Sequence, residues 1–144
     1  MTFHSALLED VAAWLAANGI GVYRETGIYQ GSERGIVALA FPESPAEIIS
    51  ISVYEPEYTA LSPTAAADLV STRLQIRWRT VGDPREGVKV FDRLHALIDR
   101  KRIELGDRIV RGKYRSYMAL GQDANNRWLF TSNWSLSAFA SRTP

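Results

Sequence analysis

Cysteine is absent from this 144-residue chain, which excludes disulfide bonds and every reaction that depends on a thiolate. Histidine is almost as scarce, and only His4 and His95 occur. The sequence contains no HExxH pattern and no acidic metal-binding loop, and an isolated imidazole does not make a metal site. We therefore expect no zinc or calcium, and we interpret His95 as a partly buried histidine with a hydrogen-bond partner.

Long apolar runs are also missing. The beginning of the chain, Met1 to His4, carries neither a basic region nor an apolar stretch. We expect no signal peptide, no membrane-spanning helix and no membrane partner, and therefore synthesis in the cytoplasm.

Motifs for nucleotide binding and hydrolysis are missing as well. No serine lies in a Gly-x-Ser-x-Gly elbow, and Gly112-Lys113 is not preceded by a phosphate-binding glycine loop. The pair Gly19-x-Gly21 lacks a third glycine and follows a predicted helix rather than a strand. We expect no catalytic residue and no cofactor, so the chain is predicted not to be an enzyme.

What the chain contains is the composition of a globular protein, with 46% hydrophobic and 23% charged residues. Its length suits a single domain over residues 1–144 with its own hydrophobic core. The net charge of +1 conceals a division, because residues 1–62 hold eight acids and two bases whereas residues 63–144 hold eight acids and fifteen bases. Three interpretations are open: the two halves compensate each other within one fold, they meet between neighbouring molecules, or the basic half binds nucleic acid.

The segment from Leu69 to Thr80 is the most regular part of the sequence. Its residues alternate between Val70, Thr72, Leu74, Ile76, Trp78 and Thr80 on one face and Ser71, Arg73, Gln75, Arg77 and Arg79 on the other. Because successive side chains of a strand point to opposite faces, this pattern predicts a long central strand with one buried and one solvated face.

A helix is predicted directly after this strand. Asp83 is a suitable N-cap, Pro84 suits the first helical position, and Glu86 stands where a capping box requires it. Apolar residues then recur at helical spacing, at Val88, Phe91, Leu94 or His95, and Ile98, and Val90 and Leu97 widen this stripe.

The remaining pattern places further elements on both sides of this strand and helix. We expect a first helix over residues 2–18, strands over 20–23, 36–41, 48–54, 108–117 and 127–139, and a helical turn over 44–47. Loops are expected over 26–35, 59–67, 103–107 and 118–126. The predicted fold class is α+β, a mostly antiparallel sheet with two main helices packed on one face.

Two basic segments also contain aromatic residues, Arg77-Trp78-Arg79 and Arg111-Gly112-Lys113-Tyr114-Arg115. A platform for stacking bases needs aromatic and basic side chains on the same face. Strand alternation instead separates Trp78 and Tyr114 from the neighbouring cations. The aromatic residues are therefore assigned to the core, although a basic surface that contacts DNA without reading bases remains an alternative.

Two parts of the sequence carry a resemblance to a known family. The strand Leu74-Gln75-Ile76-Arg77-Trp78-Arg79, followed by a helix ending Leu94-His95-x-Leu97, resembles small phage neck proteins. The stretch Leu120-Gly121-Gln122-Asp123-x-Asn125-x-Arg127-Trp128, followed by Phe130-Thr131-Ser132-Asn133-Trp134, resembles the ending of the tail terminators and minor capsid proteins of siphophages.

This resemblance implies a virion structural protein that assembles in the host cytoplasm. Tail terminators form a ring, usually a hexamer, on the head-proximal end of the tail tube, where they stop tube growth and dock onto the head connector. The expected partners are further copies of the chain, the tail tube protein and the head-connector or stopper protein, with DNA passing through the lumen. No cofactor or catalytic residue belongs to this role.

The candidate residues for subunit contacts are Arg73, Gln75, Arg77, Arg79, Gln122, Asp123 and Arg127. A solvated sheet face is the alternative interpretation of the arginines, and a hairpin turn is the alternative for Gln122, Asp123 and Arg127. Alternative functions are another head-to-tail joining (neck or head-completion) protein, a nucleic-acid-binding module that uses the basic half and, third, a small enzyme.

Overall fold

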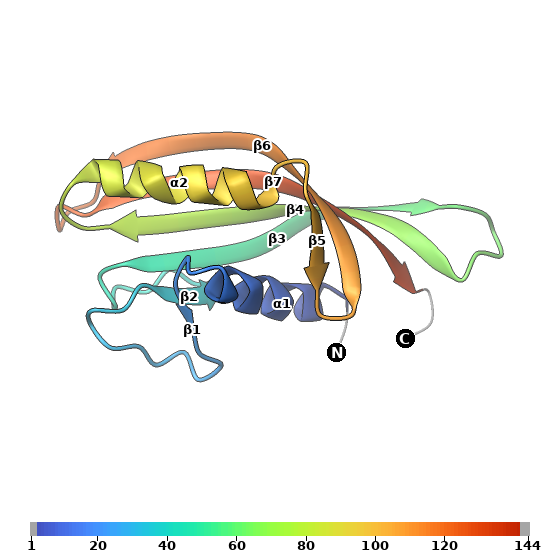
Figure 1. The fold of residues 1–144 in the computed structure, drawn as a ribbon, viewed down its shortest axis with the longest axis horizontal. Helices are drawn as coiled ribbons and strands as arrows, with labels where there is room; N and C mark the ends of the chain where they lie inside the picture. Colours follow the sequence, from blue (N-terminus) through green and yellow to red (C-terminus); the bar gives the residue numbers. More distant parts are fainter. Residues whose placement is uncertain (1–2, 142–144) are drawn as a thin grey trace.

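Seven strands form one strongly twisted sheet, and both helices lie on the same face of it (Figure 1). The computed structural model describes residues 3–141, so the predicted helix start at Thr2 lies outside the described part. The elements in chain order are α1 (Phe3–Ala17), β1 (Val22–Tyr23), β2 (Gly35–Ala38), β3 (Ile48–Ala60), β4 (Ala67–Thr80), α2 (Pro84–Ile98), β5 (Arg102–Leu105), β6 (Arg108–Gln122) and β7 (Trp128–Ser141).

The strand order in the sheet is β1-β2-β3-β4-β7-β6-β5. The pairs β1–β2 and β2–β3 are parallel, and the other pairs are antiparallel. This arrangement confirms the predicted α+β class with a mostly antiparallel sheet. It also places the strands of the acidic first part of the chain on the β1–β3 side and the strands of the basic remainder on the β4–β5 side.

The central position of β4 is confirmed, because it pairs with β3 on one side and with β7 on the other. The alternation of its side chains is also confirmed, since Val70, Thr72, Leu74, Ile76 and Trp78 are buried beneath the helices. The Trp78 ring stacks on Phe130 with centroids 5.5 Å apart, and its indole N–H donates to the Gly87 carbonyl at 3.0 Å. This strand is therefore the centre of the hydrophobic core.

Helix α2 begins as predicted, with Pro84 in its first turn and the Asp83 carboxylate accepting from the Arg85 backbone N–H at 2.9 Å. The predicted capping box does not form, because the Glu86 carboxylate instead pairs with Lys89. The face that packs on the sheet consists of Gly87, Val90, Leu94 and Ile98.

The stripe predicted to start at Val88 thus starts one residue earlier, and Val88 is 42% exposed. Gly87 lies so close to the sheet that an added Cβ would stand 2.1 Å from the Phe130 ring. A residue without a side chain is what allows the helix to approach β7 at this point.

Three segments differ from the prediction because strand pairing extends beyond the local pattern. Strand β3 continues to Ala60 through a bulge between Tyr54 and Glu57, where a loop was expected. Residues 102–105 form β5 rather than a connection, since they pair with β6 across the Gly106 turn. Strand β6 similarly continues to Gln122 through two bulges. In all three cases the segment pairs with the neighbouring strand of a hairpin, and this pairing overrides weak local preferences.

The helical turn predicted over residues 44–47 is also wrong. This segment is an irregular loop between β2 and β3, and Pro45 is buried within it. Its carbonyl groups accept hydrogen bonds from a side chain of β4 rather than from backbone N–H groups of the same segment, as described below.

Candidate functional site

The sheet face opposite the helices carries the polar half of β4. Arg73, Gln75 and Arg77 lie in register with Ser135, Asn133 and Thr131 of β7. On the other side they face Tyr54, Ser52 and Ser50 of β3. Because both helices pack on the opposite face, this open face consists mainly of hydroxyl, amide and guanidinium groups.

Short hydrogen bonds connect the strands across this open face. The Arg73 guanidinium donates to the Ser135 hydroxyl at 2.6 Å, and the Tyr54 hydroxyl donates to the Asn133 side-chain oxygen at 2.7 Å. The Asn133 amide in turn donates to the Ser116 hydroxyl at 3.0 Å. These hydrogen bonds hold the side chains in place. Because the side chains are also partly exposed, they can accept further hydrogen bonds.

Arg77 lies at the next position along this face. Its guanidinium carbon is 4.5 Å from the centroid of the Phe41 ring, which orients the cation along the sheet. Gln75 lies between the two arginines and forms no side-chain hydrogen bond with a described residue. The structure thus brings Arg73, Gln75 and Arg77 together on one partly exposed surface, as the alternation predicted.

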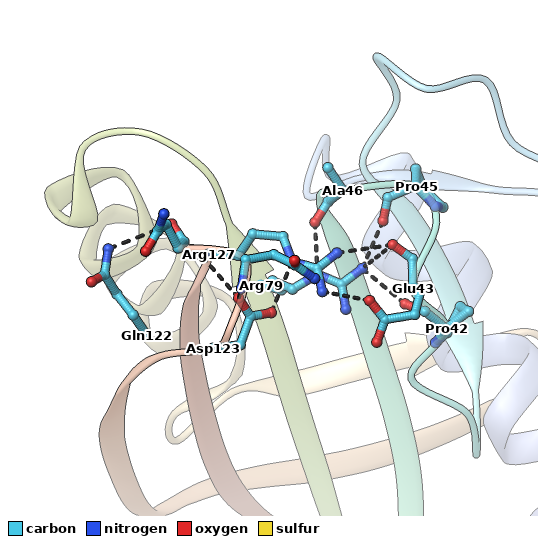
Figure 2. Close-up of polar contacts among 10 residues, drawn as sticks. Pro42, Glu43, Pro45, Ala46, Arg79, Gln122, Asp123 and Arg127 are labelled. Atoms are coloured by element: carbon cyan, nitrogen blue, oxygen red, sulfur yellow. Dashed lines mark hydrogen bonds and ion pairs between the residues drawn. The ribbon is translucent and has the colours of Figure 1, made fainter.

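Arg79 does not belong to that surface. The sequence placed it on the solvated face, and this expectation of exposure is wrong, because the residue is only 1% exposed. Its Nε donates to the Ala46 carbonyl at 2.8 Å, and its Nη2 donates to the carbonyls of Pro42, Glu43 and Pro45 at 2.8, 3.1 and 2.8 Å. The loop between β2 and β3 folds over the end of the sheet and encloses the guanidinium (Figure 2).

Within residues 3–141 no carboxylate bonds directly to this buried cation. Burial lowers the pKa of Arg79 from its ordinary value, and the nearby Arg127 cation lowers that pKa further. An arginine nevertheless stays protonated in proteins, so four backbone carbonyl groups carry the stabilisation of its charge. Arg79 therefore has a structural role, which is to hold the loop 42–46 against β4.

Gln122, Asp123 and Arg127 form the turn between β6 and β7. Asp123 Oδ1 accepts from the backbone N–H groups of Asn125 and Arg127, and Oδ2 accepts from Arg127 Nε at 2.8 Å. The backbone N–H of Arg127 is the main reason that the pKa of Asp123 is lowered. Gln122 adds a long bond of 3.5 Å to the Asn126 carbonyl.

The same turn is tied to the β2–β3 loop. Arg127 donates to the Glu43 carbonyl at 3.0 Å and to its carboxylate at 2.7 Å, so Glu43 links the two loops (Figure 2). These hydrogen bonds are those of a hairpin turn, which was the alternative interpretation of Gln122, Asp123 and Arg127. Sequence reasoning missed Glu43 and Phe41, because no local pattern indicates that the β2–β3 loop crosses the end of the sheet.

Six of the seven candidate residues fall into two groups, an open-face group of Arg73, Gln75 and Arg77 and a sheet-end group of Gln122, Asp123 and Arg127, and the buried Arg79 belongs to neither. Neither group contains a histidine, and within residues 3–141 no three His, Cys, Asp or Glu side chains lie together in a way that could hold a metal. Over the same residues no helix has the length and apolar character needed to cross a membrane. What both groups offer chemically is charge and hydrogen bonding to another macromolecular surface.

Comparison with known proteins bears directly on this arrangement. Among curated proteins, none matches this chain. A family model described as "Bacteriophage tail terminator protein" matches residues 14–138, which cover β1 to β6, most of β7 and the greater part of the chain. With its sheet, its open polar face and this match, the chain belongs to the bacteriophage tail terminator family.

Proposed function

We propose that the protein forms a closed ring, usually of six copies, on the head-proximal end of the tail tube, where it stops tube polymerisation and docks the tail onto the head connector. Membership of the family makes the protein a structural, non-enzymatic component of the phage tail, and hence of the virion, that associates with the tail tube. The match over residues 14–138 is the observation that carries the proposal.

The distribution of charge supports a ring. Residues 1–62 carry a net charge of −6 and residues 63–144 carry +7, and the strand order places these halves on opposite sides of the sheet. A ring needs two different complementary patches on each subunit, because each copy meets its neighbours head to tail. Opposite charges at the two sides of one sheet supply such a pair.

The open face is the second element of the proposal. Arg73, Gln75 and Arg77 offer hydrogen-bond donors on a surface that the helices leave uncovered. We assign them to contacts within the tail, together with the sheet-end residues Gln122, Asp123 and Arg127. Arg79 is excluded from this assignment because the β2–β3 loop leaves it only 1% exposed, whereas Arg127 is partly exposed.

Removing the protein from an assembling phage tests the function. A terminator stops the tube, so its absence should give tails longer than normal, measured by electron microscopy. A head-to-tail joining protein would instead leave free tails of normal length. Tails of normal length made without the protein would therefore refute the terminator function and favour the joining function.

A charge reversal tests the open face. Arg77→Glu should leave the protein folded and reduce the yield of normal tails in a complementation assay, because it places a carboxylate on the contact surface. Lys89→Glu is the matched control, since Lys89 is an exposed cation on α2, away from this face. Circular dichroism checks that both variants are folded. Normal tails from the Arg77→Glu protein would show that the open face is not a contact surface.

A further inference from the structure

The distal part of the β3–β4 hairpin, residues 55–66, projects beyond the rest of the sheet and is called the arm here (Figure 1). Almost all of its residues are exposed, including Tyr58 at 58% and Leu61 at 60%. Its charged residues are Glu55 and Glu57, and neither forms an ion pair with a described residue. No lysine or arginine occurs between Arg34 and Arg73, so the arm is uniformly acidic.

A basic groove lies on the other half of the sheet. Five cations line this groove of about 460 Å³, where the end of α2 meets β6: Arg100, Lys101, Arg111, Lys113 and Arg115. Only Arg100 has a carboxylate near it, since its Nε lies 3.9 Å from Asp99, and the other four form no ion pair with a described residue. Four unpaired cations on one surface favour an acidic occupant.

An apolar hollow of about 360 Å³ adjoins this groove, and Arg111 and Ser137 line both. Leu69, Ile109 and Phe139 line the hollow, and the Phe139 side chain is 64% exposed. Exposed apolar side chains add nothing to contacts with phosphate groups. The combination of cations and apolar residues therefore fits an occupant that carries both carboxylates and apolar side chains, as the arm does.

Both surfaces also contain open strand edges. Strand β3 pairs with β2 only over residues 48–51, so its part in the arm is hydrogen-bonded on one side only. Strand β6 pairs with β5 only over residues 108–111, and from Lys113 onwards β7 is its only partner strand among the described residues. On the free edge the Tyr114 backbone N–H donates to Asp99 Oδ1 at 2.8 Å, so the open part of the edge begins after Tyr114. An open edge offers backbone donors and acceptors to another chain, and such edges are normally protected.

We infer that the arm of one copy lies along the open edge of β6 in a second copy, with Glu55 and Glu57 facing the basic groove. Arm and groove are different patches, so the contact is heterologous and fits a closed ring. The inference rests on the proposed function for its ring, and it specifies which surfaces form the subunit contact. The carboxylates of the arm would then neutralise cations that have no partner within one molecule.

Crosslinking tests this contact, because the chain contains no native cysteine. Thr59→Cys places a thiol on the arm and Ser116→Cys places one on β6, and neither change removes a charge. A mixture of the two variants, treated with a short bis-maleimide in purified protein and in assembled tails, should give a covalent dimer. Thr59→Cys mixed with Lys89→Cys, on the exposed side of α2, is the control that should give at least fivefold less.

Charge reversal then tests the cause of the contact. The pair Glu55→Lys and Glu57→Lys reverses the arm, and the pair Lys113→Glu and Arg115→Glu reverses the groove. Each reversal alone should lower the crosslinking yield at least fivefold. Mixing the reversed arm with the reversed groove should restore the yield, which loss of folding cannot explain.

Three results would overturn the inference. The first is the absence of a specific crosslink both in solution and in tails, and the second is a yield unaffected by charge reversal. The third is salt-sensitive binding of a short DNA duplex that the groove reversal abolishes while crosslinking persists, because the groove would then be a nucleic-acid contact. Tail length separates this inference from the proposed function, since normal tails made without the protein would refute the function alone.

Discussion

Replacing Arg79 by methionine should destabilise the protein, although the sequence suggests an exposed residue. The guanidinium donates four hydrogen bonds of 2.8 to 3.1 Å to the carbonyls of residues 42, 43, 45 and 46. Hydrogen bonds from a charged donor contribute about 1.5–3 kcal/mol each when measured singly, and they are not additive. Methionine fills much of the volume but leaves these carbonyls without a donor.

We expect the free energy of unfolding to fall by about 3 kcal/mol in Arg79→Met, because part of the loop can turn its carbonyls towards water. With an m-value of about 2 kcal/mol per molar urea, this loss lowers the unfolding midpoint by about 1.5 M. Urea titration followed by tryptophan fluorescence measures the shift. The variant should remain folded without urea, since domains of this size have about 5–15 kcal/mol of stability.

Arg73→Met is the matched control for this prediction. Arg73 lies on the same strand and the same face, but its single bond goes to the partly exposed Ser135 hydroxyl. Its replacement should cost less than about 1 kcal/mol. Equal unfolding midpoints for the two variants would refute the reasoning, because the hydrogen bonds between Arg79 and the β2–β3 loop would then contribute nothing to the free energy of unfolding.

Three further predictions concern α2 and the core beneath it. Gly87→Ala should lower the free energy of unfolding by about 2 kcal/mol despite a better helix propensity, since its Cβ would stand 2.1 Å from the Phe130 ring; a higher urea midpoint would contradict this. Trp78→Ala should cost about 3–5 kcal/mol in the same assay, and a loss below about 1 kcal/mol would mean that the ring is not central to the core. Hydrogen bonds from the Arg85 side chain and backbone lower the pKa of Asp83 from 3.8 to about 2. The stabilisation from Asp83 is therefore complete above pH 3.8 and is lost as the pH falls towards 2, so an NMR titration midpoint near 3.8 would disprove the N-cap.

Much of the fold was predictable because its signals are local. Strict alternation identified β4 and its buried face, and the Asp83-Pro84 pair identified the start of α2. The open-face group of Arg73, Gln75 and Arg77 followed from the same alternation. The sheet-end group was predictable as a turn but not as a junction, because its link to Glu43 joins residues that are 84 positions apart.

The limits of prediction have the same physical origin at each site. Strand β5 and the extensions of β3 and β6 exist because a partner strand forms hydrogen bonds with their backbone groups. The residue types within these segments do not indicate that such a partner is present. The bulges in β3 and β6 likewise depend on the register of the neighbouring strand. A single sequence therefore underestimates the length of paired strands.

The sequence by itself determined the alternating buried face of β4, the helix that follows it, the division of charge along the chain and the absence of thiol chemistry. Each is a property of neighbouring residues or of composition. Only the tertiary structure decided that Arg79 is enclosed, that the arm projects, and that the basic residues of β6 border an open edge. These features depend on which distant segments meet, and that depends on long-range pairing and packing rather than on local pattern.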